Sequence, residues 1–351
     1  MIDYAPQDFQ YPTTRYSGSK RRFLEWIWEH VKDLQFHSVL DAFGGTGSVS
    51  LLFKRYGKQV LYNDLLKFNQ IIGRAIVEND IIKITPDDIN AILQTPLNGY
   101  PDFIQREFKG IFFPDEENAW LDKIIVSISS VENKYKQAIL MASLFQACLA
   151  KRPFNLFHRA NLNIRTASVM RTFGNKTTWE HPFPELFSRY VTEYNKAIFP
   201  NGQKNKVIGG RDALSAPNGV DSVYLDPPYF SASAPQGTNY LAFYHFLEGL
   251  ADYENWPMKI SSSNGRVRRI PHTKGIGHFT KRNEILTSFN KLLEHFQDSI
   301  IILSYQSDGI PSKDEIISIL RSFKKQPEVF SKPHRYVLSS HPKEELLFIA
   351  T

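Results

Sequence analysis

The sequence predicts an α/β fold built on an open sheet. Residues 38–65 contain a strand, a glycine-rich turn, a short helix and a second strand that ends at Asn63-Asp64. Residues 223–230 and 299–306 are apolar runs rich in β-branched and aromatic side chains, which is typical of buried strands. Residues 326–338 and 345–351 are expected to close the sheet as an antiparallel pair. Ligands bind at the carboxyl ends of the strands in such sheets, so the candidate site is expected at that edge.

Length and composition limit the kinds of protein this can be. The 351 residues are 42% hydrophobic, enough for one α/β domain with a sizeable insertion. No apolar run approaches the roughly 20 residues of a membrane span, and the polar start is unlike a secretory signal, so we expect a cytoplasmic location. The single cysteine, Cys148, excludes an intramolecular disulfide and a cysteine-based zinc site. The net charge of +6 suits a polyanionic partner.

Helices are expected between and around the strands. The turn-like residues 16–20 lead into a helix whose apolar residues, from Leu24 to Leu34, share one face. Residues 65–150 are predicted to be mostly helical, with Thr85 as an N-cap and proline at the first helical position. Two further helices are predicted over 280–297 and 311–325.

The run Val223–Phe230 ends in Asp226-Pro227-Pro228-Tyr229. Two prolines in succession force the chain out of the strand into a rigid turn. An ionised aspartate and a proline carbonyl only accept hydrogen bonds, so together they match the two donors of an exocyclic amine. The tyrosine ring can stack on the heterocycle that carries this amine. Alone, these four residues are also compatible with an ordinary turn after a strand, although the amine-binding interpretation is favoured.

The unit at 38–65 has the same order of elements as a nucleotide-binding motif. Glycines allow close backbone approach to a ligand, and an acid after the second strand can bind ribose hydroxyls. The dinucleotide fingerprint GxGxxG is absent; instead Phe43, Gly45 and Gly47 form F-x-G-x-G. We therefore expect this turn and Asp226 to line one pocket.

Residues 151–184 form a basic and aromatic segment with no acid between Lys151 and Trp179. Basic side chains neutralise phosphates, while Arg and Asn can read base edges. Gly174-Asn175 suggests the turn of a hairpin. A solvated basic loop is the alternative. The basic, serine-rich part of 251–280 is either a second phosphate-binding element or a disordered loop.

These ordered signals resemble the adenine methyltransferases of the α group, the D12 or Dam-like class. The resemblance runs from Arg15 to Ala350 and implies a Rossmann-like, seven-stranded sheet that uses S-adenosyl-L-methionine. Residues 1–80 and 200–351 would form the catalytic domain, and 81–199 a helical and basic-hairpin insertion that recognises DNA.

The resemblance also assigns roles to residues. The expected catalytic residues are Asp226, Pro227, Pro228 and Tyr229. The expected cofactor-binding residues are Tyr16, Lys20, Asp41, Phe43, Gly45, Gly47, Asp64, Asp212 and Asp226. The expected DNA-binding residues are Lys151, Arg152, Asn155, Arg159, Arg165 and Arg171.

The predicted reaction is methyl transfer to N6 of an adenine that has left the duplex stack. We expect the protein to be part of a restriction-modification system whose restriction endonuclease is a separate chain. Double-stranded DNA is the expected partner, and the protein is expected to be a monomer. We assign no metal, because His272, His278, Glu284 and Cys148 lack ligand spacing. Three alternatives remain: a cytosine-N4 enzyme, an RNA amine methyltransferase, and a DNA-binding module that has lost catalysis.

Overall fold

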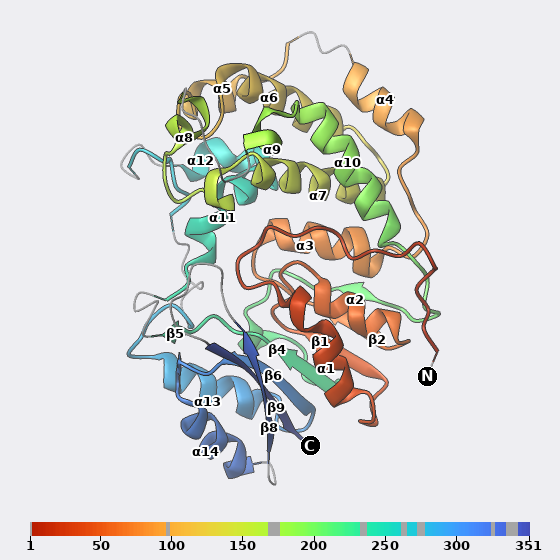
Figure 1. Ribbon diagram of the computed structural model, residues 1–351, viewed down its shortest axis with the longest axis vertical. Coiled ribbons are helices and arrows are strands. Elements are labelled where there is room, and N and C mark those ends of the chain that lie inside the picture. Colours follow the sequence, from red (N-terminus) through yellow and green to blue (C-terminus); the bar gives the residue numbers. More distant parts are fainter. Residues whose placement is uncertain are drawn as a thin grey trace.

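A computed structural model describes residues 2–95, 99–167, 176–231, 237–260, 265–271, 278–323, 327–334 and 343–351. A twisted sheet with helices on both faces forms one part of the molecule, and a layer of helices lies beside it (Figure 1). The α/β class predicted from the sequence is therefore confirmed.

The main sheet has seven strands in the order β3-β2-β1-β4-β6-β9-β8. Neighbours from β3 to β6 run parallel, whereas β9 is antiparallel to both β6 and β8. The predicted closing pair is thus present as β8 and β9. The strands are β1 Ser38–Asp41, β2 Gln59–Tyr62, β3 Lys206–Val207, β4 Ser222–Leu225, β6 Ile300–Gln306, β8 Glu328–His334 and β9 Lys343–Ala350. A second sheet pairs β5 Phe230–Ser231 with β7 Gly309–Ile310.

Helices cover both faces of the sheet, and successive strand residues point to opposite faces. In β1, Val39 packs in the core beneath α1 and α2, and Leu40 in the core beneath α13 and α14. This explains why the central strands β1, β4 and β6 are buried almost throughout. The covering helices are α1 Leu24–Val31, α2 Ser48–Arg55, α3 Lys67–Gly73, α13 Ile285–His295 and α14 Lys313–Phe323.

A fully buried lysine joins the first helices to one another. Lys54 of α2 donates from Nζ to the carbonyls of Val77 (3.0 Å) and Asn79 (2.8 Å) and pairs with Asp80 at 2.9 Å. These carbonyls lie at the end of η2, a π-helical turn over Arg74–Glu78 that extends α3. The ammonium therefore satisfies backbone acceptors that the end of η2 leaves free.

The helical layer contains most of the region predicted to be helical. Its helices are α4 Pro86–Gln94, α5 Phe103–Glu107, α6 Asp115–Ser129, α7 Lys134–Ala150, α8 Leu162–Thr166, α9 Lys176–Glu180, α10 Phe183–Lys196, α11 Tyr240–Leu250 and α12 Trp256–Lys259. Thr85 caps α4 as predicted: its hydroxyl accepts from the backbone N–H of Asp88, whose carboxylate accepts in return.

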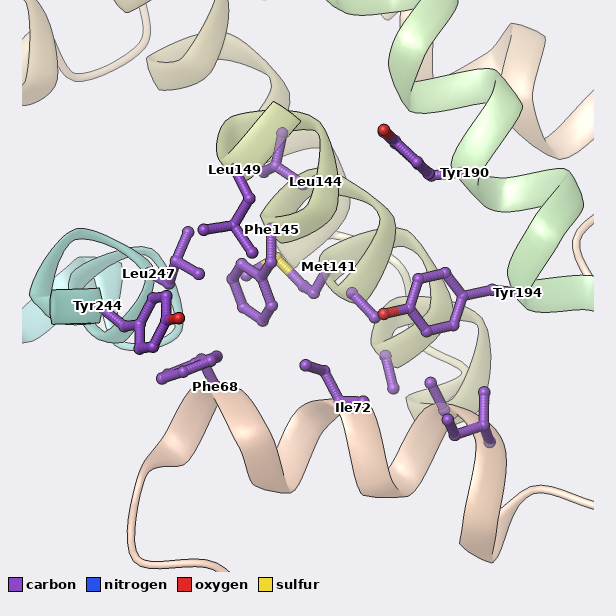
Figure 2. Packing of buried hydrophobic residues seen from close by; sticks show 14 of the residues in the cluster. Phe68, Ile72, Met141, Leu144, Phe145, Leu149, Tyr190, Tyr194, Tyr244 and Leu247 are labelled. Carbon is purple, nitrogen blue, oxygen red and sulfur yellow. The ribbon is translucent and has the colours of Figure 1, made fainter. Parts of the chain in front are cut away.

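The layer is joined to the sheet by α3. Phe68 and Ile72 of α3 face Phe145 of α7, with Tyr194 of α10 and Tyr244 of α11 at the two sides (Figure 2). The rings of Phe68 and Phe145 meet edge to face at 5.9 Å. Such buried aromatic contacts make α3 part of both cores.

The packing bears on the predicted insertion of 81–199, which stays a prediction. Helices α4–α10 lie within that range, but α11 and α12, from the expected catalytic part, join the same layer. Trp256 of α12, for example, packs on Phe103 and Phe108. No helix within the described residues has the length and apolar character needed to cross a membrane.

The expected basic hairpin is wrong for the residues that the structure describes. Residues 151–167 and 176–184 contain short helices and no strand. They include α8, α9 and a 3-10 turn, η3, over Pro153–Asn155. Residues 168–175, with Arg171 and the Gly174-Asn175 turn, lie outside the described residues.

Candidate active site

A cavity lies at the carboxyl ends of β1, β2 and β4, the edge predicted from the sequence. Asp41 ends β1, Asp64 follows β2 and Asp226 follows β4, so the fold brings three carboxylates to one place. The glycine turn Phe43–Thr46 lines the same cavity, as predicted. The empty space is about 1110 Å³, part of it open to solvent. From the predicted cofactor set, the lining includes Tyr16, Lys20, Asp41, Phe43, Gly45, Asp64, Asp212 and Asp226.

The glycine turn is held against Asp64. The backbone N–H of Gly45 donates to Oδ2 of Asp64 (2.9 Å) and that of Leu66 to Oδ1 (2.8 Å). Gly45 and Gly47 have φ of 51° and 70°, which side chains with a Cβ rarely adopt. Gly47 itself is not a lining residue; it is the N-cap of α2. A Cβ on Gly44 would come within 2.1 Å of the Tyr62 ring, so that position also needs glycine.

Asp41 is buried with one oxygen free of protein partners. Oδ2 accepts from the Ser50 hydroxyl at 2.7 Å. Oδ1 is buried and has no hydrogen-bond partner in the described structure. Burial raises the pKa of Asp41 to about 7, the Ser50 bond opposes this, and the charge of Asp226 adds to it. An orphaned acidic oxygen in a cavity suits a cationic ligand.

Asp226 is held by a buried lysine. Lys20, at the start of the 3-10 turn η1 Lys20–Phe23, lies with Nζ 3.1 Å from Oδ1 of Asp226 and 3.0 Å from Oε1 of Glu345. Burial raises the pKa of Asp226 to about 6; Lys20 lowers it and Glu345 raises it. Burial alone would lower the pKa of Lys20, but the two acids outweigh burial and raise it well above its usual value.

The rest of the Asp226–Tyr229 turn is fixed by its neighbours. Pro227 is buried and Pro228 lines the cavity. Tyr229 is half-buried, packs against Tyr305 with ring centroids 4.9 Å apart, and donates from its hydroxyl to Oε1 of Gln306 at 2.9 Å. Tyr229 and Pro227 are not among the residues that line this cavity.

Tyr16 belongs to an aromatic stack that the sequence did not reveal. Its ring is nearly parallel to those of Tyr244 (centroids 4.5 Å apart) and Tyr240 (5.4 Å), both of α11, whose own centroids are 6.5 Å apart. The backbone N–H of Ser17 donates to the Tyr244 hydroxyl at 2.7 Å. Helix α11 therefore holds the turn that precedes Lys20.

Asp212 follows β3, as predicted, and caps the 3-10 turn η4 Ala213–Ser215. Its Oδ1 accepts from the backbone N–H of Leu214 at 3.0 Å, and its Oδ2 lies 3.7 Å from Nε2 of His278. Both residues line the cavity. The role of Asp212 toward a cofactor adenine stays a prediction.

The structure corrects the expectation for Arg152, which is fully buried. Its guanidinium donates to the carbonyls of Phe112 (3.1 Å), Leu156 (3.2 Å) and Arg159 (2.9 Å), and also to the side chain of Asn161. These bonds close the loop 153–161 around the guanidinium. Arg152 therefore organises this loop: four of its five N–H donors are used inside the protein, and its side chain does not reach the surface.

Lys151 and Arg165 are also engaged inside the protein. Both form ion pairs with Glu117 of α6, Lys151 at 2.7 Å and Arg165 at 2.8 Å, and their side chains are 3% and 6% exposed. They are poorly placed for phosphate contacts. The sequence prediction failed because it counted acids only within the basic segment.

The outer side of the same loop is different. Arg159 is exposed, and so is Phe154, at 69%. Phe154 and Asn155 have φ of 61° and 56°, a strained conformation for residues with a side chain. Oδ1 of Asn155 accepts from Arg15, next to Tyr16 of the cavity, at 3.5 Å. Arg269, from the second basic segment, donates to the carbonyl of His158 at 3.0 Å.

Several of these features had no usable signal in the sequence. Glu345 lies in an apolar strand whose letters do not mark it as a partner of Lys20. The strain at Phe154 follows from the fold and not from its residue type. No group of acidic, histidine or cysteine side chains that could hold a metal is found among the described residues.

Comparisons with known proteins agree with this geometry. A family model described as D12 class N6 adenine-specific DNA methyltransferase matches residues 16–262. The chain is 28% identical to the type II methyltransferase M2.HphI of Haemophilus parahaemolyticus, over 97% of this chain and 98% of that protein. It is 26% identical to M.FokI of Planomicrobium okeanokoites, over 94% of this chain but 50% of that protein. It is 23% identical to M.NlaIII of Neisseria lactamica, over 92% of each chain.

Proposed function

Because the chain belongs to the D12 class of N6 adenine-specific DNA methyltransferases, we propose that it modifies one short duplex sequence as the methyltransferase of a type II restriction system. The observation that carries the proposal is the meeting of Asp226 and the glycine turn in one cavity. The relatives named above are called type II methyltransferases, which supports the restriction role.

Asp226 and the carbonyl of Pro227 would bind the target amine. Both groups only accept hydrogen bonds, so they match the two N–H donors of an adenine N6 amine and exclude a ring oxygen. Oδ1 of Asp226 is occupied by Lys20, and Oδ2 has no protein partner in the described structure. This leaves one carboxylate oxygen for the substrate. Holding both hydrogens orients the nitrogen lone pair, so placement supplies much of the rate.

The cavity residues fit S-adenosyl-L-methionine, the methyl donor of this class. The bound cofactor supplies a methyl group made electrophilic by its positive sulfonium. Asp41 offers its unpartnered Oδ1 to the cationic amino acid part, and Asp64 lies where an acid can bind ribose hydroxyls. Tyr16 and Asp212 line the remaining walls. Three acids in one cavity favour a ligand with positive charge.

The target adenine has to leave the helix to reach Asp226, at a cost of a few kcal/mol. Phe154 is suited to offset part of this cost, because it is an exposed aromatic on a loop that Arg152 holds from inside. Apolar side chains that enter a duplex stabilise unstacked steps in other DNA-bending proteins. Tyr229 would meet the flipped base with its ring face.

The DNA backbone would meet the outer side of the loop 153–161. Arg159 is exposed there, and the segment 265–271 with Arg269 lies against it. The two basic segments predicted separately are in contact here and would together present one surface to DNA. This supports a phosphate-binding role for 265–271 over the alternative of a disordered loop. The separate endonuclease chain, the monomeric state and the cytoplasmic location remain predictions.

Methylome sequencing tests the proposal directly. DNA from cells that express the chain should carry N6-methyladenine at one short sequence, and DNA from cells with the Asp226→Ala variant should carry none. N4-methylcytosine in place of N6-methyladenine, or methylated ribosomal RNA with unmodified DNA, would favour the corresponding alternative reaction. Cofactor binding without any transfer would favour the inactive DNA-binding module.

A further inference from the structure

Glu345 is a buried acid whose position the proposed chemistry does not explain. It is 1% exposed and lies in β9, two strands away from β4, which precedes Asp226. Its Oε1 accepts from the Ser304 hydroxyl at 2.8 Å and lies 3.0 Å from Nζ of Lys20. Residues of this kind are almost never fully buried unless paired.

Lys20, Asp226, Glu345 and Ser304 form a cluster that spans the three neighbouring strands β4, β6 and β9. Leu225, just before Asp226, pairs with Leu303 of β6, and Gln306 pairs with Glu345 of β9. Ser304 lies between these two registers. Lys20 therefore bridges β6, with one acid on each side of that strand.

Stability does not account for the second acid. Lys20 and Asp226 alone would form a neutral pair, whereas Glu345 leaves the cluster with an excess negative charge in a buried place. Removing two charges from water usually costs more than their attraction returns, and an additional buried charge adds to that cost. A buried charge that lowers stability in this way points to a role in function.

The geometry supplies such a role. An ammonium between two carboxylates is held from both sides, and the Ser304 bond fixes one of them. Lys20 is thereby held on Oδ1 of Asp226. We propose that Glu345 is a positioning residue for methyl transfer, which holds Lys20 on Oδ1 of Asp226 and keeps Oδ2 for the target amine. This inference rests on the role proposed above for Asp226.

Among the described residues, the charged and titratable groups around Asp226 include Lys20 of η1, Glu345 of β9, Asp41 of β1 and Tyr224 of β4. Of these, Lys20 stabilises the ionised form of Asp226, and Glu345 opposes ionisation. Loss of the Glu345 charge should therefore lower the pKa of Asp226.

The test compares Glu345→Gln, Glu345→Asp and the matched control Glu344→Gln, which removes the same charge from an exposed neighbour on β9. Single-turnover transfer is measured across pH at saturating cofactor and DNA, together with cofactor affinity and urea stability. For Glu345→Gln we expect a rate about 10- to 100-fold lower at neutral pH, because misplacement by a fraction of an ångström is costly. The acid limb of its pH–rate profile should move to lower pH by about one unit. Cofactor affinity should change little, and stability should stay the same or rise, because a buried charge has been removed.

Glu345→Asp keeps the charge, so the acid limb of its pH–rate profile should stay in place. Its rate should lie between those of the wild type and Glu345→Gln. The control should equal the wild type. If Glu345→Gln fails to fold, Ser304→Ala serves instead, because it removes the hydroxyl that fixes Glu345 and keeps the charge of Glu345; a rate loss of about threefold or more at near wild-type stability is then expected.

Two results would overturn the inference. One is a wild-type rate in Glu345→Gln. The other is a lower rate with an unmoved acid limb and lower stability, which means a structural role alone. Failure of the proposed function is distinguishable, because it would appear as full transfer by Asp226→Ala.

Discussion

Asp41 gives the protein two opposite dependences on pH, and Asp41→Asn should remove both. The carboxyl is 1% exposed, and burial raises its pKa from 3.8 to about 7. Between these values the folded state keeps a proton that the unfolded state has lost, so stability falls as the pH rises. This contribution is fully present below about pH 4 and is lost once the pH passes about 7.

The magnitude follows from the shift. A difference of about three pKa units corresponds to at most about 4 kcal/mol, which the partial opening of the cavity to water will reduce. Asparagine cannot ionise, so Asp41→Asn should match the wild type only near pH 4 and below, and should increasingly exceed its stability as the pH rises to 8. Ser50 can donate to the asparagine oxygen as it does to Oδ2.

Cofactor affinity should change in the opposite sense. An ionised Asp41 attracts a cationic ligand, so wild-type affinity should rise as the pH passes about 7. In Asp41→Asn the affinity should be nearly independent of pH in this range and about 30-fold weaker at pH 8, or about 2 kcal/mol.

The assays are urea denaturation of the free protein and cofactor titration by calorimetry, each at pH 5.5, 7 and 8.5. Asp33→Asn, a substitution of an exposed acid, should behave as the wild type. The reasoning is refuted if the wild type and Asp41→Asn show the same pH dependence in both measurements.

The remaining predictions concern the loop, the lysine of α2 and the stacking ring. Arg152→Ala should lower stability by about 3 kcal/mol and leave the salt slope of DNA binding unchanged. Arg159→Ala should reduce that slope by about one. The opposite pattern would support the sequence prediction that Arg152 contacts DNA. Phe154→Ala should reduce 2-aminopurine fluorescence at the target and slow transfer to paired adenine more than to mismatched adenine; equal slowing would exclude a role in flipping. Lys54→Met should lower stability by about 2–3 kcal/mol through unsatisfied carbonyls, and an unchanged urea midpoint would contradict this. Tyr229→Ala should damage turnover more than Tyr229→Phe, and equal rates would argue against stacking.

The sheet and most of the cavity were predictable because their signals are local. Buried strands are continuous apolar runs, and the strand at Asp226 ends where two prolines remove the ladder donors. Gly45 and Gly47 in the turn mark positive φ directly. The acids at 41, 64 and 226 follow strands, so topology alone brings them together.

The errors came from contacts that cross the chain. Arg152 reads as a phosphate ligand because its acceptors are backbone carbonyls, which no residue letter reveals. Lys151 and Arg165 seemed unpaired because Glu117 lies on another helix. The partner of Lys20 was missed for the same reason, since Glu345 is distant in sequence and stands in an apolar strand.

The place of β9 has a consequence for how the enzyme comes into being. This strand enters between β6 and β8, and it brings Glu345 to a cluster whose other members were made long before. During synthesis on the ribosome, an emerging polypeptide would carry the glycine turn and Asp226 yet lack the strand that completes them. Modification of the genome would therefore begin only after residues 343–350 have left the exit tunnel, and incomplete chains would not methylate DNA.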